Sequence, residues 1–158
     1  MRRWEQGRAQ VQQMLDDNRL TPTHASPELA QSYIDTARRR LLAVESIQEI
    51  DPAGAFVLTY DGARLGMAAI LINQGLRPRG EGAHAILLEV VLAQLEPPRQ
   101  QEFREFAWMR RLRNDTHYPD VDRPLAGPDD LAQAMPATLA IVDCAEQVIP
   151  HMPPFASA

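Results

Sequence analysis

Residues 51–75, with the sequence DPAGAFVLTYDGARLGMAAILINQG, decide the fold of this chain. Asp51 followed by Pro52 is typical of a helix start, because a side-chain oxygen caps the first turn and proline suits the first helical position. Gly75 is a typical C-cap. Between them, apolar side chains occupy much of the helix circumference: Phe56, Val57, Leu58, Tyr60, Leu65, Met67, Ile70, Leu71 and Ile72. A helix that is apolar on most sides is covered by its neighbours, so this one is predicted to lie at the centre of a bundle.

Further helices are predicted on both sides of the central one. Ser26, Pro27 and Glu28 form a cap, a first-turn proline and a first-turn acid. Apolar residues then recur at helical spacing as far as Ile47. The other predicted helices cover residues 2–17, 83–95, 98 to about 112, and 128–148. Strand signals are scarce, and no internal repeat is evident.

These signals predict an all-α fold, an up-and-down bundle of five or six helices, because short connections between long helices favour antiparallel neighbours. The bundle is expected over residues 26–148. An N-terminal helix and linker (1–25) precede it, and a flexible C-terminal tail (149–158) follows it. The chain has 158 residues, 45% of them apolar, which is enough for one domain with a sizeable core.

The charge of the chain limits its partners. A net charge of −5 argues against a protein that coats nucleic acid through bulk electrostatics, although a local basic patch can still bind a phosphate. Arg38, Arg39 and Arg40 fan around one predicted helix and are expected to form a solvated face.

No metal and no cofactor are expected. Cys144 is the only cysteine, which excludes an internal disulfide and a cysteine-based metal site. The four histidines, His24, His84, His117 and His151, show no ligand spacing. No glycine-rich phosphate loop follows a predicted strand.

The expected location is the cytoplasm, with no membrane segment. No apolar run approaches the roughly 20 residues that a membrane helix needs. The first five residues, Met-Arg-Arg-Trp-Glu, are charged and lack the apolar core of a secretion signal.

Functional chemistry concentrates in residues 109–119, Met-Arg-Arg-Leu-Arg-Asn-Asp-Thr-His-Tyr-Pro. Arginine presents a fixed fork of donors that suits phosphate, and histidine can move a proton near neutral pH. Cleavage of RNA without a metal needs a base for the 2′-hydroxyl, an acid for the leaving oxygen and cations for the charged phosphorane. The segment contains candidates for each of these tasks.

The run from Arg111 to Pro119 resembles the signature of HEPN domains, an arginine and a polar residue followed by a histidine four to six residues further on. Residues 60–64, 75–77 and 82–84 are also similar to the central helices of bacterial HEPN proteins. The resemblance implies a dimerising helical bundle in which the two motifs meet and form a composite site for RNA cleavage. Many bacterial members are toxins or defence effectors beside a nucleotidyltransferase-like partner.

The motif departs from the family pattern at its histidine. Four intervening residues after Arg113 lies Tyr118, and His117 comes one residue early. His117 pairs instead with Arg111, at five intervening residues, but that pairing loses the adjacent asparagine. The motif is therefore either an inactive variant or a shifted active pair. For the active case we assign Arg113 to the scissile phosphate, Asn114 to orienting it, His117 to acid or base, and Tyr118 to donation of a hydrogen bond or proton.

A second group is expected to extend the substrate-binding site. Arg110 and Arg111 flank the motif, and Asp61, Arg64 and His84 come from the central stretch. Asp61 and Arg64 are three residues apart, so they share a helix face and can pair. The alternative interpretation is structural: the arginines interact with a helix C-terminus and nearby acids, Asn114 caps that helix, and Asp61–Arg64 is a polar pair within the bundle.

Together these features predict a homodimeric, metal-independent endoribonuclease, or an RNA-binding HEPN protein, of a toxin–antitoxin or defence system. By analogy with some HEPN toxins, Tyr118 is a candidate for modification with AMP by a nucleotidyltransferase-like antitoxin. The alternative function is a catalytically silent helical module that binds a protein partner or a nucleotide. Tyrosine at position 118 and the acidic net charge favour that alternative.

Overall fold

The structure, a computed structural model, describes residues 3–122 and 124–156. Helices dominate this part of the chain, as predicted: α1 (Arg8–Asp16), α2 (Pro27–Ile47), α3 (Pro52–Gln74), α4 (Ala83–Leu95), α5 (Gln100–His117) and α6 (Pro128–Val148). Two three-residue strands, β1 (Leu20–Pro22) and β2 (Leu76–Pro78), and a 3-10 turn at Ile149–His151 complete the described elements. The all-α helical bundle is therefore confirmed.

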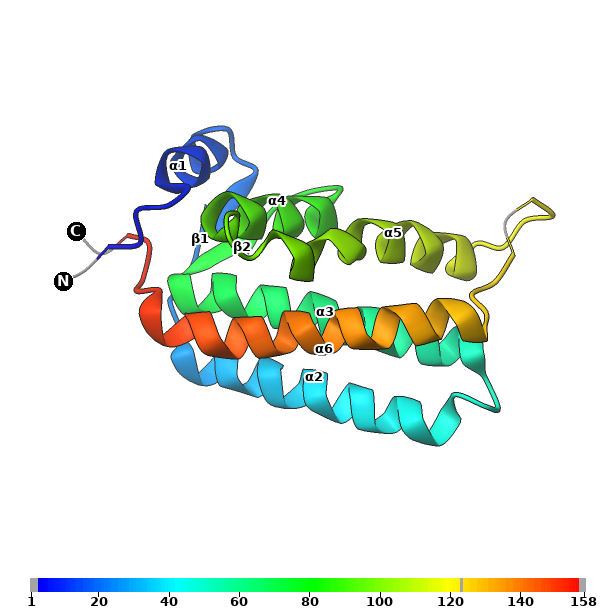
Figure 1. Ribbon diagram of the computed structural model, residues 1–158. Coiled ribbons are helices and arrows are strands. Elements are labelled where there is room, and N and C mark those ends of the chain that lie inside the picture. Colours follow the sequence, from blue (N-terminus) through cyan, green and yellow to red (C-terminus); the bar gives the residue numbers. More distant parts are fainter. Residues whose placement is uncertain (1–2, 123, 157–158) are drawn as a thin grey trace.

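The central helix of the bundle is α3. It packs along α2 and α6, while α4 and α5 form a layer over this group (Figure 1). Phe56, Met67 and Ile70 of α3 are fully buried. At Gly66 the helices α3 and α6 approach closely, because a Cβ there would lie 3.3 Å from Cγ2 of Val142. The predicted central position of residues 52–74 is confirmed.

The length and hydropathy of α3 would also suit a membrane-crossing helix. In its most apolar window, however, 67% of the residues are buried inside the bundle. The core helix of a folded domain has this pattern, because its apolar surface is covered by other helices.

Local capping sets the starts of α2 and α3 and the end of α3. The Ser26 side chain accepts a hydrogen bond from the Leu29 amide at 3.1 Å, and the Asp51 side chain accepts one from the Gly54 amide at 2.9 Å. Gly75 ends α3 with φ at 75°, a conformation that glycine adopts without the steric penalty of a Cβ. These three boundaries are where the sequence places them.

The ends of the described chain pack against the bundle. Strand β1 pairs antiparallel with β2, so that Thr21 lies opposite Arg77. Met152 and Phe155 are buried, and the Phe155 amide donates to the carbonyl of Gln74 at 2.9 Å. The predicted tail thus contributes apolar side chains to the core, and the predicted boundary at residue 148 is not an edge of the packed structure.

Candidate functional site

A buried tyrosine and a histidine form the centre of the candidate site. The hydroxyl of Tyr60, in the middle of α3, and Nδ1 of His84, in the first turn of α4, share a hydrogen bond of 2.6 Å. The ring of Phe106 stacks on Tyr60 with centroids 5.1 Å apart. His84 is one of the substrate-binding residues predicted from the sequence, whereas its partner Tyr60 is not.

Both members of this pair are neutral near pH 7. Burial raises the pKa of the Tyr60 hydroxyl to about 12, which keeps it protonated. Burial lowers the pKa of His84, and the positive charges of Arg64, Arg113 and Arg110 lower it further. An imidazole that stays neutral can accept a proton, so His84 has the protonation state of a base.

Two arginines of α5 lie beside the Tyr60–His84 pair. The guanidinium carbon of Arg113 is 5.7 Å from the centroid of the Tyr60 ring, and Arg110 is one helical turn earlier on α5. Both side chains are half-buried, and neither forms an ion pair with a carboxylate of a described residue. The Nε atom of Arg113 is buried and has no hydrogen-bond acceptor among those residues. Cations partly removed from water without a counter-charge are costly, and an anion would offset that cost.

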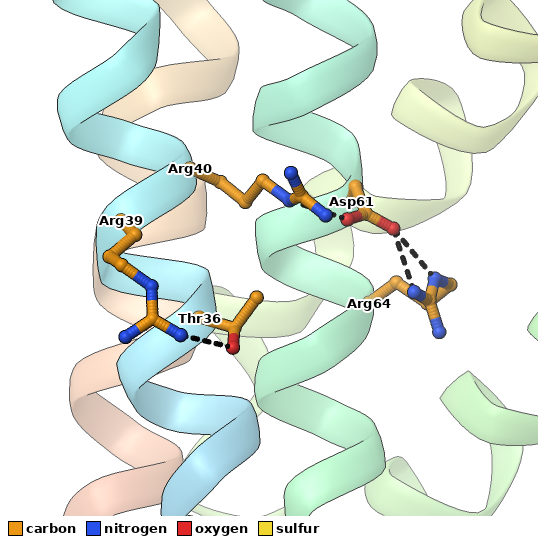
Figure 2. A network of polar contacts seen from close by, with 5 residues as sticks. All are labelled: Thr36, Arg39, Arg40, Asp61 and Arg64. Atoms are coloured by element: carbon orange, nitrogen blue, oxygen red, sulfur yellow. Dashed lines mark hydrogen bonds and ion pairs between the residues drawn. The ribbon is translucent and has the colours of Figure 1, made fainter.

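A third arginine, Arg64 on α3, lowers the pKa of His84 through its charge and is itself partly neutralised by an acid. Oδ1 of Asp61 accepts hydrogen bonds from Nη2 of Arg64 at 2.7 Å and Nε at 3.1 Å, so the predicted pair is present. Oδ2 of Asp61 accepts one from Nε of Arg40 at 3.2 Å (Figure 2). One carboxylate therefore faces two guanidinium groups, and the net local charge stays positive. We call Tyr60, Asp61, Arg64, His84, Arg110 and Arg113 the α3–α5 cluster.

The consecutive arginines of α2 do not form one uniform face. Arg38 pairs with Asp143 at 3.0 Å and Glu146 at 3.3 Å on α6. Figure 2 shows Arg40 directed toward Asp61, whereas Arg39 donates to the Thr36 hydroxyl on its own helix at 2.9 Å. Arg39 and Arg40 are exposed, as the sequence pattern predicts, but Arg40 also borders the α3–α5 cluster.

The structure divides the predicted motif into two parts. Arg110 and Arg113 join the α3–α5 cluster, whereas His117 and Tyr118 lie exposed at the C-terminal end of α5. Their rings contact each other, with centroids 6.4 Å apart. Within the described part of the chain, no hydrogen bond or ring contact joins His117 to Tyr60, His84 or Arg113. The histidine that accompanies Arg113 is therefore His84.

The remaining motif residues have peripheral positions. Arg111 is exposed on α5, and Asn114 is exposed next to Arg113, whose Nη1 donates to its Oδ1 at 3.4 Å. At the end of α5 the Tyr118 amide donates to the backbone carbonyl of Asn114 at 3.0 Å. The sequence contains one indication that Tyr60 belongs to the site: Tyr60 and Arg64 are four residues apart and therefore share a helix face.

The chemistry available in the α3–α5 cluster is that of an anion site with a proton acceptor. Three guanidinium groups suit phosphate oxygens, and His84 retains one ring nitrogen, Nε2, that bonds to no described residue. Among the described residues, no three His, Cys, Asp or Glu side chains are grouped so that they could hold a metal ion.

Comparisons of the chain with protein-family models, curated proteins and solved structures give no match.

Proposed function

We propose that the chain binds RNA by holding a backbone phosphate in the α3–α5 cluster and cleaves it as a metal-independent endoribonuclease of the HEPN type. One observation carries the proposal: the guanidinium of Arg113 lies 5.7 Å from the centroid of the Tyr60 ring, whose hydroxyl shares a hydrogen bond with His84. The positive charges of Arg64, Arg113 and Arg110 also act on this histidine, because they help burial to lower its pKa. Phosphate is the anion that best matches several guanidinium forks, since each fork can hold two oxygens. His84 also occupies the first turn of α4, where the helix dipole favours negative charge.

In the proposed reaction the base is His84 in place of His117. In the tautomer with a proton on Nδ1, that nitrogen donates to the Tyr60 oxygen, and the lone pair of Nε2 is available. Nε2 takes the proton of the 2′-hydroxyl, the 2′-oxygen forms a bond to phosphorus, and the bond to the 5′-oxygen breaks. The leaving 5′-oxygen takes a proton from solvent. Arg113 and Arg110 stabilise the negative charge that develops on the phosphate.

The biological setting proposed for this activity comes from the HEPN resemblance. It comprises a cytoplasmic homodimer in a toxin–antitoxin or defence system, with a nucleotidyltransferase-like antitoxin as partner. The alternative function, a catalytically silent helical module that binds a protein or a nucleotide, has one observation in its favour. His84 is the only histidine in the α3–α5 cluster, and the second histidine of the motif region, His117, is exposed at the end of α5.

The test is cleavage of total RNA by the purified chain in the presence of EDTA. We expect cleavage by the wild type, loss with Arg113→Ala and His84→Gln, and no change with the matched variants Arg104→Ala and His24→Gln. Arg104 is exposed on the same helix as Arg113, and His24 is exposed outside the cluster. Cleavage that needs a divalent cation, or that survives both cluster substitutions, would contradict the proposal. RNA binding that depends on Arg113 without any cleavage would assign the chain to the silent module.

A further inference from the structure

We infer that the exposed rings of His117 and Tyr118 form a stacking platform for a nucleobase, so that the RNA bound at the α3–α5 cluster is single-stranded. This inference rests on the proposed function and specifies the substrate class. The platform adjoins the helix that carries two arginines of the cluster: α5, with Arg110 and Arg113, runs from Gln100 to His117 and is followed at once by Tyr118.

The platform is one turn away from the phosphate-binding arginines. Positions 110, 113 and 117 are separated by three and four residues, so they follow one side of the helix. Four residues advance the helix by about 6 Å, which separates His117 from Arg113 by a distance comparable to a nucleotide step. A strand whose phosphate lies at Arg113 can therefore place a neighbouring base at the end of α5.

The exposure of these rings has no structural explanation within the described chain. Tyr118 has 76% of its surface exposed, and its hydroxyl bonds to no described residue. The Tyr118 and His117 rings are tilted by 51° and contact only each other among the described aromatic groups. Solvent-accessible aromatic faces beside arginines are a recurring arrangement in single-strand binding, because every base presents a face for stacking. Arg111, also exposed on α5, adds positive charge nearby.

The chemistry of stacking selects single strands. In a duplex the base faces are covered by neighbouring pairs, whereas unpaired bases can turn outward and stack on aromatic side chains. Alanine substitution at such a contact costs about 1–3 kcal/mol per base, or roughly 5- to 150-fold in affinity. The aromatic rings at the end of α5 then provide the part of the RNA affinity that depends on nucleobases, and the arginines provide the part that depends on phosphate.

The experiment measures affinity by fluorescence anisotropy for three uncleavable 2′-fluoro probes: a single-stranded 12-mer, the same backbone with abasic sites throughout, and a duplex of the same sequence. We expect the wild type to prefer the single strand to the abasic probe at least 5-fold. Tyr118→Ala should lower the affinity for the single-stranded probe to that of the wild type for the abasic probe, and it should leave the affinity for the abasic probe unchanged. Tyr118→Phe should retain the preference, and Val121→Ala, a control in the same loop with 97% of its surface exposed, should have no effect.

Each other outcome has a distinct meaning. Equal binding of the single-stranded and abasic probes, both dependent on Arg113, would overturn the platform and leave the phosphate site intact. Binding of none of the probes would overturn the proposed function and the platform together. A Tyr118→Ala variant with unchanged RNA affinity and altered oligomeric state in sedimentation would assign the ring to a protein contact and overturn the platform.

Discussion

The hydroxyl of Tyr60 lies 2.6 Å from Nδ1 of His84, and this hydrogen bond ties the centre of α3 to the first turn of α4. It orients an imidazole whose pKa is already lowered by burial and by three arginines. Because Nδ1 is occupied, only Nε2 is available to a ligand. The pair links two helices and, in the proposed function, orients the base, and substitutions can separate these two contributions.

Replacing Tyr60 with phenylalanine keeps the stacking on Phe106 and removes only the hydroxyl. The half-buried Nδ1 of His84 then lacks its partner, so we expect the free energy of unfolding in urea to fall by about 1–3 kcal/mol. Cleavage should fall further than RNA affinity, because the arginines remain. Tyr33→Phe is the matched control. Its hydroxyl bonds to no described residue, and the change should stay within about 0.5 kcal/mol. Equal losses for both variants would refute a special role for the Tyr60 hydroxyl.

Titration of His84 should make stability depend on pH. Its pKa is lowered in the folded protein, so between that pKa and the unfolded value of about 6.5 the unfolded chain binds more protons. The stabilisation is therefore complete above about pH 6.5 and is lost as the pH falls through the folded pKa. We expect Tm to decrease below pH 6.5 and to decrease less steeply in His84→Gln. Parallel Tm profiles for the two proteins would contradict this assignment.

Arg113 should contribute more to binding than to stability. Arg113→Met keeps much of the apolar stem and removes a half-buried charge that has no ion-pair partner among the described residues. We expect Tm to be unchanged or raised, RNA affinity to fall roughly 10-fold or more, and the slope of log affinity against log salt to decrease by about 1. Arg104 is exposed on the same helix, and Arg104→Met should change none of these three quantities. A large fall in the Tm of Arg113→Met would show that Arg113 is mainly structural.

Alanine substitutions at two glycines can distinguish the energetic cost of a strained backbone from the cost of a steric clash. Gly7 and Gly80 have φ values of 73° and 80°, so alanine at either position costs about 1–2 kcal/mol for its conformation. At Gly7 an added Cβ would also lie 2.1 Å from the carbonyl oxygen of Ala93, whereas nothing lies within 4 Å at Gly80. We expect urea denaturation to show a loss of at least about 3 kcal/mol for Gly7→Ala and about 1 kcal/mol for Gly80→Ala. Equal losses of unfolding free energy in the two variants would show that α1 can move away from Ala93 without an energetic cost.

The helices were predictable because their signals are local. Ser26 and Asp51 cap amides three residues ahead, and Gly75 ends α3 through its own φ value. The Asp61–Arg64 pair is predictable for the same reason, since its partners are three residues apart on one helix. The role of α3 as the core helix follows from its composition, because a helix apolar on most sides has to be covered by its neighbours.

The centre of the candidate site was decided by tertiary structure. Tyr60 and His84 are 24 residues apart and meet only because α4 packs over α3, and Arg113 reaches them from α5. The sequence places His117 near Arg113, but spacing along one helix does not tell which side chains from other helices lie opposite. The buried Met152 and Phe155 were missed for the same reason. The sequence alone determined the helices and supplied the arginines, because capping and periodicity act over a few residues. Packing between distant segments placed His84, and not His117, beside Tyr60 and Arg113, because burial and contact depend on the whole fold.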